Sequence, residues 1–265
     1  MNRPLFGKRV LVTRAEGQAE KIADLLRERG AEPLVVPTIA FEPPTDPEPL
    51  RKAIASLADY GWVLFTSENG VRFFWESLTH QGLDARALAN ARLGAVGPGT
   101  AQALEARGLR ADVVAKEFRG EGLAQAVLEA MATARPRVLL ARAEEAREVL
   151  PETLRAAGCV VDVAPAYVTR PAVGAGERLR ELFAGPGVDA VLFTSASTVA
   201  SFCDALGPDA TKLLATARVA SIGPITTEAA EKRGVHVAVT ASSHTVPALV
   251  EALELSYRLD ASSLA

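Results

Sequence analysis

Two Thr-Ser pairs are the residues in this sequence best suited to hold an anionic ligand. They open the segments Thr66-Ser67-Glu68-Asn69-Gly70 and Thr194-Ser195-Ala196-Ser197-Thr198. Each pair follows an apolar run typical of a buried strand and precedes a helical pattern. Free N–H groups at a helix start favour carboxylates or phosphates, although Ser and Thr also act as simple N-caps there. Because the pair occurs twice, we predict substrate-binding roles for Thr66, Ser67, Asn69, Gly70, Thr194, Ser195 and Ser197.

Two Gly-Pro pairs form a second candidate motif. They stand in Gly97-Pro98-Gly99-Thr100 and in Gly223-Pro224-Ile225-Thr226-Thr227. Glycine after a strand lets a ligand approach the backbone, and proline suits the first turn of a helix. Neither segment is a P-loop or a dinucleotide fingerprint, and an ordinary strand-to-helix turn explains the pattern equally well. The residues that we assign to substrate binding on this pattern are Gly97, Pro98, Thr100, Gly223, Thr226 and Thr227.

Two arginines and one tyrosine complete the candidate site. Arg14 and Arg142 each follow an apolar run, and arginine can bind a carboxylate bidentately; pairing with Glu16 or Glu144 is the structural alternative. The phenol of Tyr167 could donate a proton, or it could simply be half-buried with its hydroxyl in water. No metal-ligand spacing joins the other titratable candidates, which we assign to loops or to the core: His80, His236, His244, Cys159 and Cys203.

The sequence repeats itself. Residues 9–16 match residues 137–144, which lie 128 positions later, and residues 63–67 match 191–195 at the same offset. The pair Gly97-Pro98 matches Gly223-Pro224 at an offset of 126. A similar order of apolar runs is expected of any two βα units, but the shared Thr-Ser, Gly-Pro and Arg-Ala-Glu are not. The repeat therefore indicates a duplicated half.

Strands and helices are expected to alternate within the repeat. Short apolar runs predict strands at 9–13, 33–36, 62–65, 93–96 and 111–114, and helical spacing predicts helices between them, for example at 100–107 and 123–131. This alternation predicts an α/β fold with parallel sheets covered on both faces by right-handed crossovers. Two Pro- and Gly-containing stretches, 41–49 and 167–176, are interpreted as linkers, so the chain leaves one lobe, completes the other and returns.

Composition limits the classes of function. The chain has 265 residues, of which 49% are hydrophobic and 23% charged, and its net charge is −3. These values fit an ordinary globular protein and disfavour a nucleic-acid partner. No apolar stretch is long enough to span a membrane, and no signal-peptide pattern is present. We therefore expect no membrane association, a cytoplasmic location and a monomer.

The ordered motifs resemble those of the uroporphyrinogen-III synthase family. The resemblance rests on the blocks VLVTRAEGQAEKIADLLRERGAEPLVVP, DYGWVLFTSENGVRFF, LGAVGPGTAQALEARG, FRGEGLAQAVLEA, RVLLARAEEAREVLPETLRAAGCVVDVAPAYVTR, DAVLFTSASTVASF, VASIGPITTEAAEKRGV and SSHTVPALVEAL. It implies two similar flavodoxin-like or Rossmann-like domains, joined by a two-stranded linker with the active site in the cleft between them. The implied domain 1 is 1–38 plus 171–265, the implied domain 2 is 42–165, and the linkers are about 39–41 and 166–170.

The resemblance also implies an activity. Members are lyases that cyclise hydroxymethylbilane, a linear tetrapyrrole with eight carboxylates, to uroporphyrinogen III, with loss of water and inversion of the last pyrrole ring through a spiro intermediate. No cofactor and no metal are implied. Tyr167 matches a recurrent tyrosine that helps the hydroxyl to leave. Two departures are the change from Asn69-Gly70 to Ser197-Thr198 and a tail after Leu253, which matches nothing and is expected to be disordered or peripheral.

Two other functions fit parts of the pattern. A two-lobed α/β protein can be a non-catalytic binder of small carboxylates that closes about its linkers. A phosphate- or nucleotide-handling α/β enzyme is a further alternative, although the missing glycine-rich fingerprints disfavour it.

Overall fold

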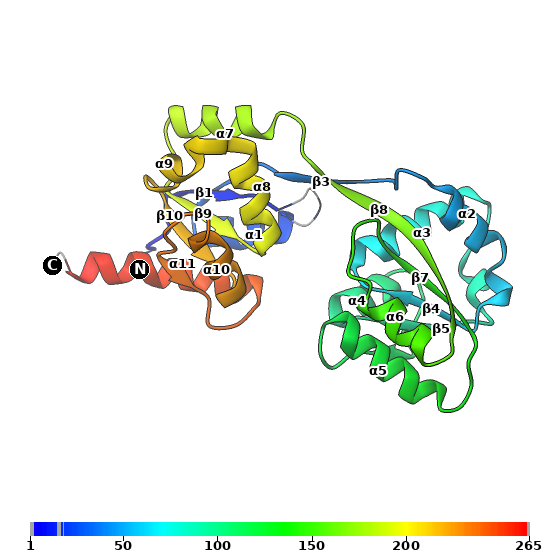
Figure 1. Ribbon diagram of the computed structural model, residues 1–265. Coiled ribbons are helices and arrows are strands. Elements are labelled where there is room, and N and C mark those ends of the chain that lie inside the picture. The colour runs from blue at the N-terminus through cyan, green and yellow to red at the C-terminus, as the bar shows by residue number, and fades with distance from the viewer. Residues whose placement is uncertain (1–2, 15–16, 18, 264–265) are drawn as a thin grey trace. The chain divides into compact units, whose positions relative to one another are not determined.

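The chain forms two compact units. A computed structural model describes residues 3–14, 17 and 19–263. Unit 1 comprises Met1–Ala40 and Arg170–Ala265, and unit 2 comprises Phe41–Thr169. Both passages of the chain between the units lie inside strands, β3 (Ile39–Glu42) and β8 (Val160–Pro171), which are neighbours in one sheet (Figure 1). Each unit has its own sheet and its own apolar core.

Unit 1 is built on a parallel sheet with the order β11-β10-β9-β1-β2. One face packs against α7, α8, α9 and α10, and the other against α1 and α11. The strands are β1 (Arg9–Val12), β2 (Glu32–Val35), β9 (Ala190–Phe193), β10 (Arg218–Ser221) and β11 (Val239–Thr240). The helices are α1 (Glu20–Glu28), α7 (Ala175–Ala184), α8 (Ala196–Leu206), α9 (Ala210–Leu214), α10 (Pro224–Glu231) and α11 (Val246–Ser263), with a 3₁₀ turn η3 at Gly207–Asp209.

Unit 2 has the sheet order β3-β8-β7-β4-β5-β6, and β8, β7, β4, β5 and β6 pair in parallel. Helices α2, α3 and α4 cover one face, and α5 and α6 the other. The remaining strands are β4 (Trp62–Phe65), β5 (Arg92–Ala95), β6 (Val113–Val114) and β7 (Arg137–Ala143). The helices are α2 (Glu48–Ala55), α3 (Glu68–His80), α4 (Pro98–Glu105), α5 (Gly120–Met131) and α6 (Val149–Ala156), with 3₁₀ turns η1 (Leu57–Asp59) and η2 (Ala85–Leu88).

The predicted fold class, α/β with parallel sheets covered on both faces, is confirmed. The central strands are almost fully apolar and buried, as expected of strands that have helices on both sides. The two sheets also correspond strand by strand: β2-β1-β9-β10-β11 matches β8-β7-β4-β5-β6 at the repeat offset. Each sheet therefore combines strands from both sequence copies.

The two stretches interpreted as linkers lie where the chain passes between the units, and both contain regular secondary structure. Residues 41–42 belong to β3, and α2 begins at Glu48 with Pro49 in its first turn. In the second stretch β8 continues to Pro171, and α7 begins at Ala175. The prolines do not interrupt this structure, because proline is tolerated in the first turn of a helix and at the end of a strand.

The tail after Leu253 was expected to be disordered or peripheral, but it continues α11 as far as Ser263. Glu254 forms an ion pair with Arg29 at 3.1 Å. The Arg218 guanidinium lies 4.1 Å from the centre of the Tyr257 ring. The helix is therefore held to the amino ends of the unit 1 strands by polar contacts that a search for apolar periodicity does not detect.

Asp189 connects the amino ends of three unit 1 strands. Its N–H donates to the Arg9 carbonyl and its own carbonyl accepts from the Arg218 N–H, both at 2.9 Å. Its carboxylate accepts from the Arg9 N–H at 2.8 Å and from Lys8 Nζ at 2.9 Å, and the Tyr257 hydroxyl donates to its carbonyl at 2.8 Å. Burial pushes the pKa of Asp189 upward, but the hydrogen bonds from Arg9 and Lys8 outweigh it and hold the pKa below its usual value.

We predict that Asp189→Ala lowers the free energy of unfolding by about 1–2 kcal/mol near neutral pH, because two hydrogen bonds to the carboxylate are lost. The pKa of Asp189 is lower in the folded chain, so this contribution is complete above the unfolded pKa of about 4 and disappears as the pH falls through the folded value. Chemical denaturation of wild type and variant at neutral and strongly acidic pH measures it. An equal loss of unfolding free energy at both pH values would contradict the prediction. Asp24→Ala, which changes an exposed aspartate on α1, is the control.

Candidate functional site

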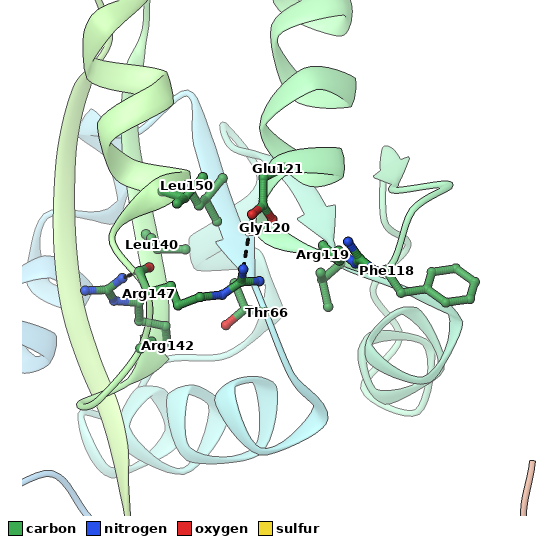
Figure 2. Close-up of a pocket in the computed structure, with 12 residues that line it drawn as sticks. Thr66, Phe118, Arg119, Gly120, Glu121, Leu140, Arg142, Arg147 and Leu150 are labelled. Carbon is green, nitrogen blue, oxygen red and sulfur yellow. Dashed lines mark hydrogen bonds and ion pairs between the residues drawn. The ribbon is translucent and has the colours of Figure 1, made fainter. Parts of the chain in front are cut away.

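A pocket of about 220 Å³ opens at the carboxyl ends of β4, β5 and β7 in unit 2 (Figure 2). Ligands of open α/β sheets bind at this end of the strands. Its lining includes Thr66, Phe118, Arg119, Gly120, Arg142 and Arg147. The three arginines come from the start of α5, the end of β7 and the loop before α6, so the pocket suits an anionic group.

The start of α5 faces this pocket. The side chain of its N-cap residue, Arg119, accepts no hydrogen bond from the helix. The Leu123 N–H donates to the Arg119 carbonyl at 3.1 Å and makes the first hydrogen bond of the helix. Uncapped N–H groups and the helix dipole favour an anion. Gly122 is required here because a Cβ would lie 2.4 Å from the Glu117 carbonyl oxygen. The loop and the helix start are therefore packed tightly together.

Arg142 lines the pocket but is buried, with 5% of its surface exposed. It lies within β7 rather than after it, and it pairs with Glu148, so the expected partner Glu144 is wrong. Its Nη1 also donates to the Arg147 carbonyl at 2.9 Å. Glu144 instead accepts a bond from the Thr45 N–H at 2.7 Å. Arg142 thus fixes the loop that carries Arg147.

Arg147 reaches across the pocket. Figure 2 shows its side chain extending toward Glu121 at the start of α5, and the Nη1–Oε1 distance is 3.1 Å. Both side chains are well exposed, and an exposed pair of this kind contributes little to stability. Its guanidinium is therefore available to an anionic ligand that competes with Glu121.

Tyr167 reaches its position because of a bulge in β8. Arg142 of β7 pairs with Pro165, but Ala143 pairs with Tyr167, so Ala166 is an extra residue between them. Strand alternation would place Tyr167 on the face that carries Val161. The bulge turns it onto the opposite face, over α3.

The Tyr167 ring is 7% exposed, so the expectation of a half-buried ring with its hydroxyl in water is wrong. It stacks on Phe73 with centroids 5.6 Å apart and meets Phe41 edge-on at the same distance. The hydroxyl lies 3.0 Å from Ser67 Oγ. Burial raises the pKa of Tyr167, and the bond to Ser67 offsets this only in part, so the phenol is protonated at neutral pH.

The Thr-Ser turns act as helix caps in both units. Ser67 Oγ accepts the Gly70 N–H at 2.9 Å. Ser195 and Thr198 form a capping box at the start of α8, and Ser197 Oγ lies 2.9 Å from Ser195 Oγ. Ser67 and Ser195 are therefore helix N-caps. The neighbouring residues Thr66 and Thr194 are partly exposed.

The glycines of the Gly-Pro turns were expected to let a ligand approach the backbone, but side chains of this chain cover them. A Cβ on Gly97 would lie 3.2 Å from the Phe118 ring, and one on Gly223 would lie 2.4 Å from the His244 ring. Gly97 has an extended backbone that any residue adopts. The absence of a side chain, not an unusual φ angle, is what these positions require.

Several other candidates are buried by packing. Gly70 is buried, and a Cβ there would lie 3.2 Å from the Ala141 carbonyl oxygen. Thr100 and Thr226 are each 4% exposed, whereas Pro98 is exposed and Asn69 partly exposed. Arg14 follows β1 and is partly buried. Its suggested partner, Glu16, lies outside the described residues.

Unit 1 carries a cluster of hydroxyls at the carboxyl end of β10. Thr227 Oγ1 lies 2.6 Å from Ser221 Oγ and 2.8 Å from Thr240 Oγ1. The equivalent positions of Ser221 and Thr240 in unit 2 are Ala95 and Val114. The two units therefore differ here: unit 1 has a hydroxyl cluster where unit 2 has apolar side chains, and the pocket of unit 2 is lined by arginines.

Sequence reasoning missed part of this arrangement: Phe118, Arg119, Arg147, Ser221, Thr240 and the position of His244 over its turn. A signal for the rings was present, because Phe118 and His244 are equivalent at the repeat offset of 126. The pocket arginines have no such signal, since exposed arginines occur throughout the chain.

Residues 3–14, 17 and 19–263 offer neither a metal site nor a membrane-spanning helix. No group of three or more His, Cys, Asp or Glu side chains is arranged there to hold a metal ion. No helix in the described part of the chain is long and apolar enough to cross a membrane.

The fold is that of a protein with two parallel-sheet α/β units, and the Thr-Ser and Gly-Pro turns lie at the carboxyl ends of the strands. A family model described as "Uroporphyrinogen-III synthase HemD" matches residues 20–251. The chain belongs to the uroporphyrinogen-III synthase family, which is a family of enzymes of tetrapyrrole biosynthesis.

Two curated relatives are each 33% identical to this chain. One is the "Uroporphyrinogen-III synthase" of Synechococcus elongatus, where the match covers 95% of this chain and 96% of that protein. The other is the "Porphyrin biosynthesis protein HemD" of Ruminiclostridium josui, where it covers 96% of this chain but 49% of that protein. The chain thus spans about half the length of the second relative.

Solved structures share the fold. A mutant uroporphyrinogen III synthase from Thermus thermophilus matches with a TM-score of 0.63 and 24% identity, over 95% of this chain and 99% of that one. The enzyme from Helicobacter pylori matches with a TM-score of 0.59 and 20% identity, over 94% and 99%.

We predict that Ser67→Ala lowers the free energy of unfolding by about 1–2 kcal/mol, because α3 loses its cap and Tyr167 loses its hydroxyl partner. Thr66→Val, beside it, is expected to change stability by less than about 0.5 kcal/mol, since no described residue hydrogen-bonds the Thr66 hydroxyl. Denaturant titrations of both variants make the comparison. Equal losses in the two variants would show that Ser67 is not a stabilising cap.

Proposed function

We propose that this chain cyclises hydroxymethylbilane to uroporphyrinogen III, as a hydro-lyase. The observation that carries the proposal is the family match over residues 20–251, together with a relative of which the match covers 96%. The site chemistry supports it, because a substrate with many carboxylates needs many N–H, hydroxyl and guanidinium donors. The alternative of a non-catalytic carboxylate binder is not favoured by this family membership.

In the proposed reaction the substrate hydroxyl takes a proton and leaves as water. The cation that remains is attacked by the α-carbon of the last pyrrole ring that already carries the bridging methylene, which gives a spiro intermediate. The bond between that carbon and the methylene then breaks, the methylene forms a bond to the other α-carbon of the same ring, and that carbon loses a proton. The overall change is loss of one water molecule. Because the cation is reactive, the main task of the protein is to hold the chain in one geometry and keep water away from it.

Carboxylate binding in this proposal falls to the polar groups at the strand ends. In unit 2 these are Arg119, Arg147 and the N–H groups at the start of α5, with Thr66 as a hydroxyl donor. In unit 1 they are Thr194 and Thr227, with Arg14 after β1. Guanidinium groups bind carboxylates by paired, charge-assisted hydrogen bonds, which gives orientation as well as affinity.

Tyr167 is the proposed catalytic residue. It keeps its proton at neutral pH because burial raises its pKa, and Ser67 holds its hydroxyl at 3.0 Å. A protonated, oriented phenol can donate to a departing hydroxyl or stabilise developing charge. Packing against Phe73 and Phe41 limits its rotation.

We also propose that the chain acts in the cytoplasm as a monomer. Both cysteines, Cys159 and Cys203, are free and buried, as is common in a reducing compartment. Each unit buries its own apolar clusters. Light scattering during gel filtration tests the monomer, and a mass of twice the chain would contradict it.

The activity is tested with freshly prepared hydroxymethylbilane. We expect the type III isomer in the presence of the protein and the symmetrical type I isomer, from spontaneous closure, in its absence. Chromatography of the oxidised porphyrins separates the two isomers. If only type I forms at every enzyme concentration, the proposed function is wrong.

Tyr167→Phe is expected to lower kcat about a hundredfold, the typical contribution of a general acid, while the melting temperature changes by only a few degrees. Tyr60→Phe is the matched control. It removes a hydroxyl that bonds Asp162 at 2.8 Å, at the opposite end of the same sheet. Its kcat should equal that of the wild type. Wild-type turnover by Tyr167→Phe would exclude the proposed role.

A further inference from the structure

Phe118 is an aromatic side chain whose exposure the fold does not explain. Its ring is 66% exposed and belongs to none of the apolar clusters in the described part of the chain. It stands at the rim of the unit 2 pocket, where Figure 2 shows the ring directed outward from the α5 loop. Single exposed apolar side chains are common, but this ring borders a pocket that Arg119 and Arg147 also line, where it is placed to contact a flat, anionic ligand.

The Phe118 ring packs against Gly97. Its Cδ1 lies 3.2 Å from the place where a Cβ of Gly97 would be, so the ring rests on the glycine at the start of α4. The backbone of Gly97 is extended and does not itself call for glycine. The glycine therefore makes room for the ring, which keeps one side on the protein and the other available.

Unit 1 repeats this arrangement with a different ring. His244 is equivalent to Phe118 at the repeat offset, and its imidazole lies over Gly223 at the start of α10. The residues that follow the two rings differ, Arg-Gly-Glu-Gly after Phe118 and Thr-Val-Pro-Ala after His244. A planar ring over a glycine is thus common to both units although the adjoining loops have diverged.

We infer that Phe118 stacks on a pyrrole ring of the substrate, with His244 as its counterpart in unit 1; the inference rests on the proposed function. Pyrroles are flat and electron-rich, and aromatic side chains bind flat rings by offset or edge-on contact. Each pyrrole of the substrate also carries carboxylate side chains. Arg119, the next residue after Phe118, and Arg147 across the pocket supply the matching cations.

The experiment compares Phe118→Ala, Phe118→Leu and Phe118→Tyr in steady-state kinetics with hydroxymethylbilane and in equilibrium titrations with uroporphyrin III. We expect Ala and Leu to raise KM and the dissociation constant about five- to tenfold, which is the fold change for one lost aromatic contact, with kcat within about twofold. Tyr retains the ring and should restore wild-type values. His244→Ala should weaken the binding of uroporphyrin III in the same way.

Phe6→Ala is the matched control. Phe6 is 73% exposed and also rests on a glycine, Gly30, but at the amino end of the unit 1 strands. Its KM should not change. Phe118→Leu keeps an apolar cover on Gly97, so a merely structural role predicts wild-type values for Leu, whereas stacking predicts the Ala phenotype.

The outcomes separate this inference from the proposed function. Type III product from the wild type, with KM and porphyrin binding of Phe118→Ala or Phe118→Leu within about twofold, overturns the stacking role alone. No type III product from the wild type overturns the proposed function. In that case weaker binding of uroporphyrin III by Phe118→Ala still supports a tetrapyrrole contact, and no binding by the wild type overturns both.

Discussion

The parallel pairing of strands from opposite halves of the sequence is the constraint on which both units depend. Val10 of β1 pairs with Ala190 of β9, and Trp62 of β4 pairs with Val138 of β7. Each of these pairings joins the strands of one sequence copy to those of the other: β1 connects β2 to β9, and β7 connects β8 to β4. Without them each sheet would divide into two parts. Parallel pairing also brings the carboxyl ends of the strands to one edge, where the Thr-Ser turns, the Gly-Pro turns and the pocket lie.

The two units keep this frame but have diverged in its details. At the amino end of the central strands, unit 1 has Asp189 where unit 2 has Gly61. A Cβ on Gly61 would lie 2.6 Å from Pro136, while Asp189 faces Lys8 and binds it. At the carboxyl end, unit 1 has the cluster of Ser221, Thr227 and Thr240 hydroxyls, and unit 2 has the pocket lined by arginines. An asymmetric linear substrate suits a protein whose two duplicated halves offer different donors.

Packing and function share the same residues at the proposed site. Ser67 caps α3 and lies within hydrogen-bond distance of the Tyr167 hydroxyl, so the phenol proposed as catalytic is oriented by a group that the helix already requires. Arg142 is buried in the pocket wall and fixes the loop of Arg147. Rigid support of this kind would keep the geometry of the site constant while its exposed members, Arg147 and Phe118, make the contacts proposed for them.

The sequence by itself determined the alternation of strands and helices, the duplication and the turns at which helices begin. These are local or periodic properties, since burial on both faces selects apolar runs and helix starts select Ser, Thr, Gly and Pro. Only the tertiary structure decided which face of β8 carries Tyr167, because one extra residue at Ala166 reverses the alternation. It likewise decided that Arg142 pairs with Glu148 and that rings cover Gly97 and Gly223. Such contacts join residues whose distance along the chain carries no periodic signal, and packing in three dimensions selects them.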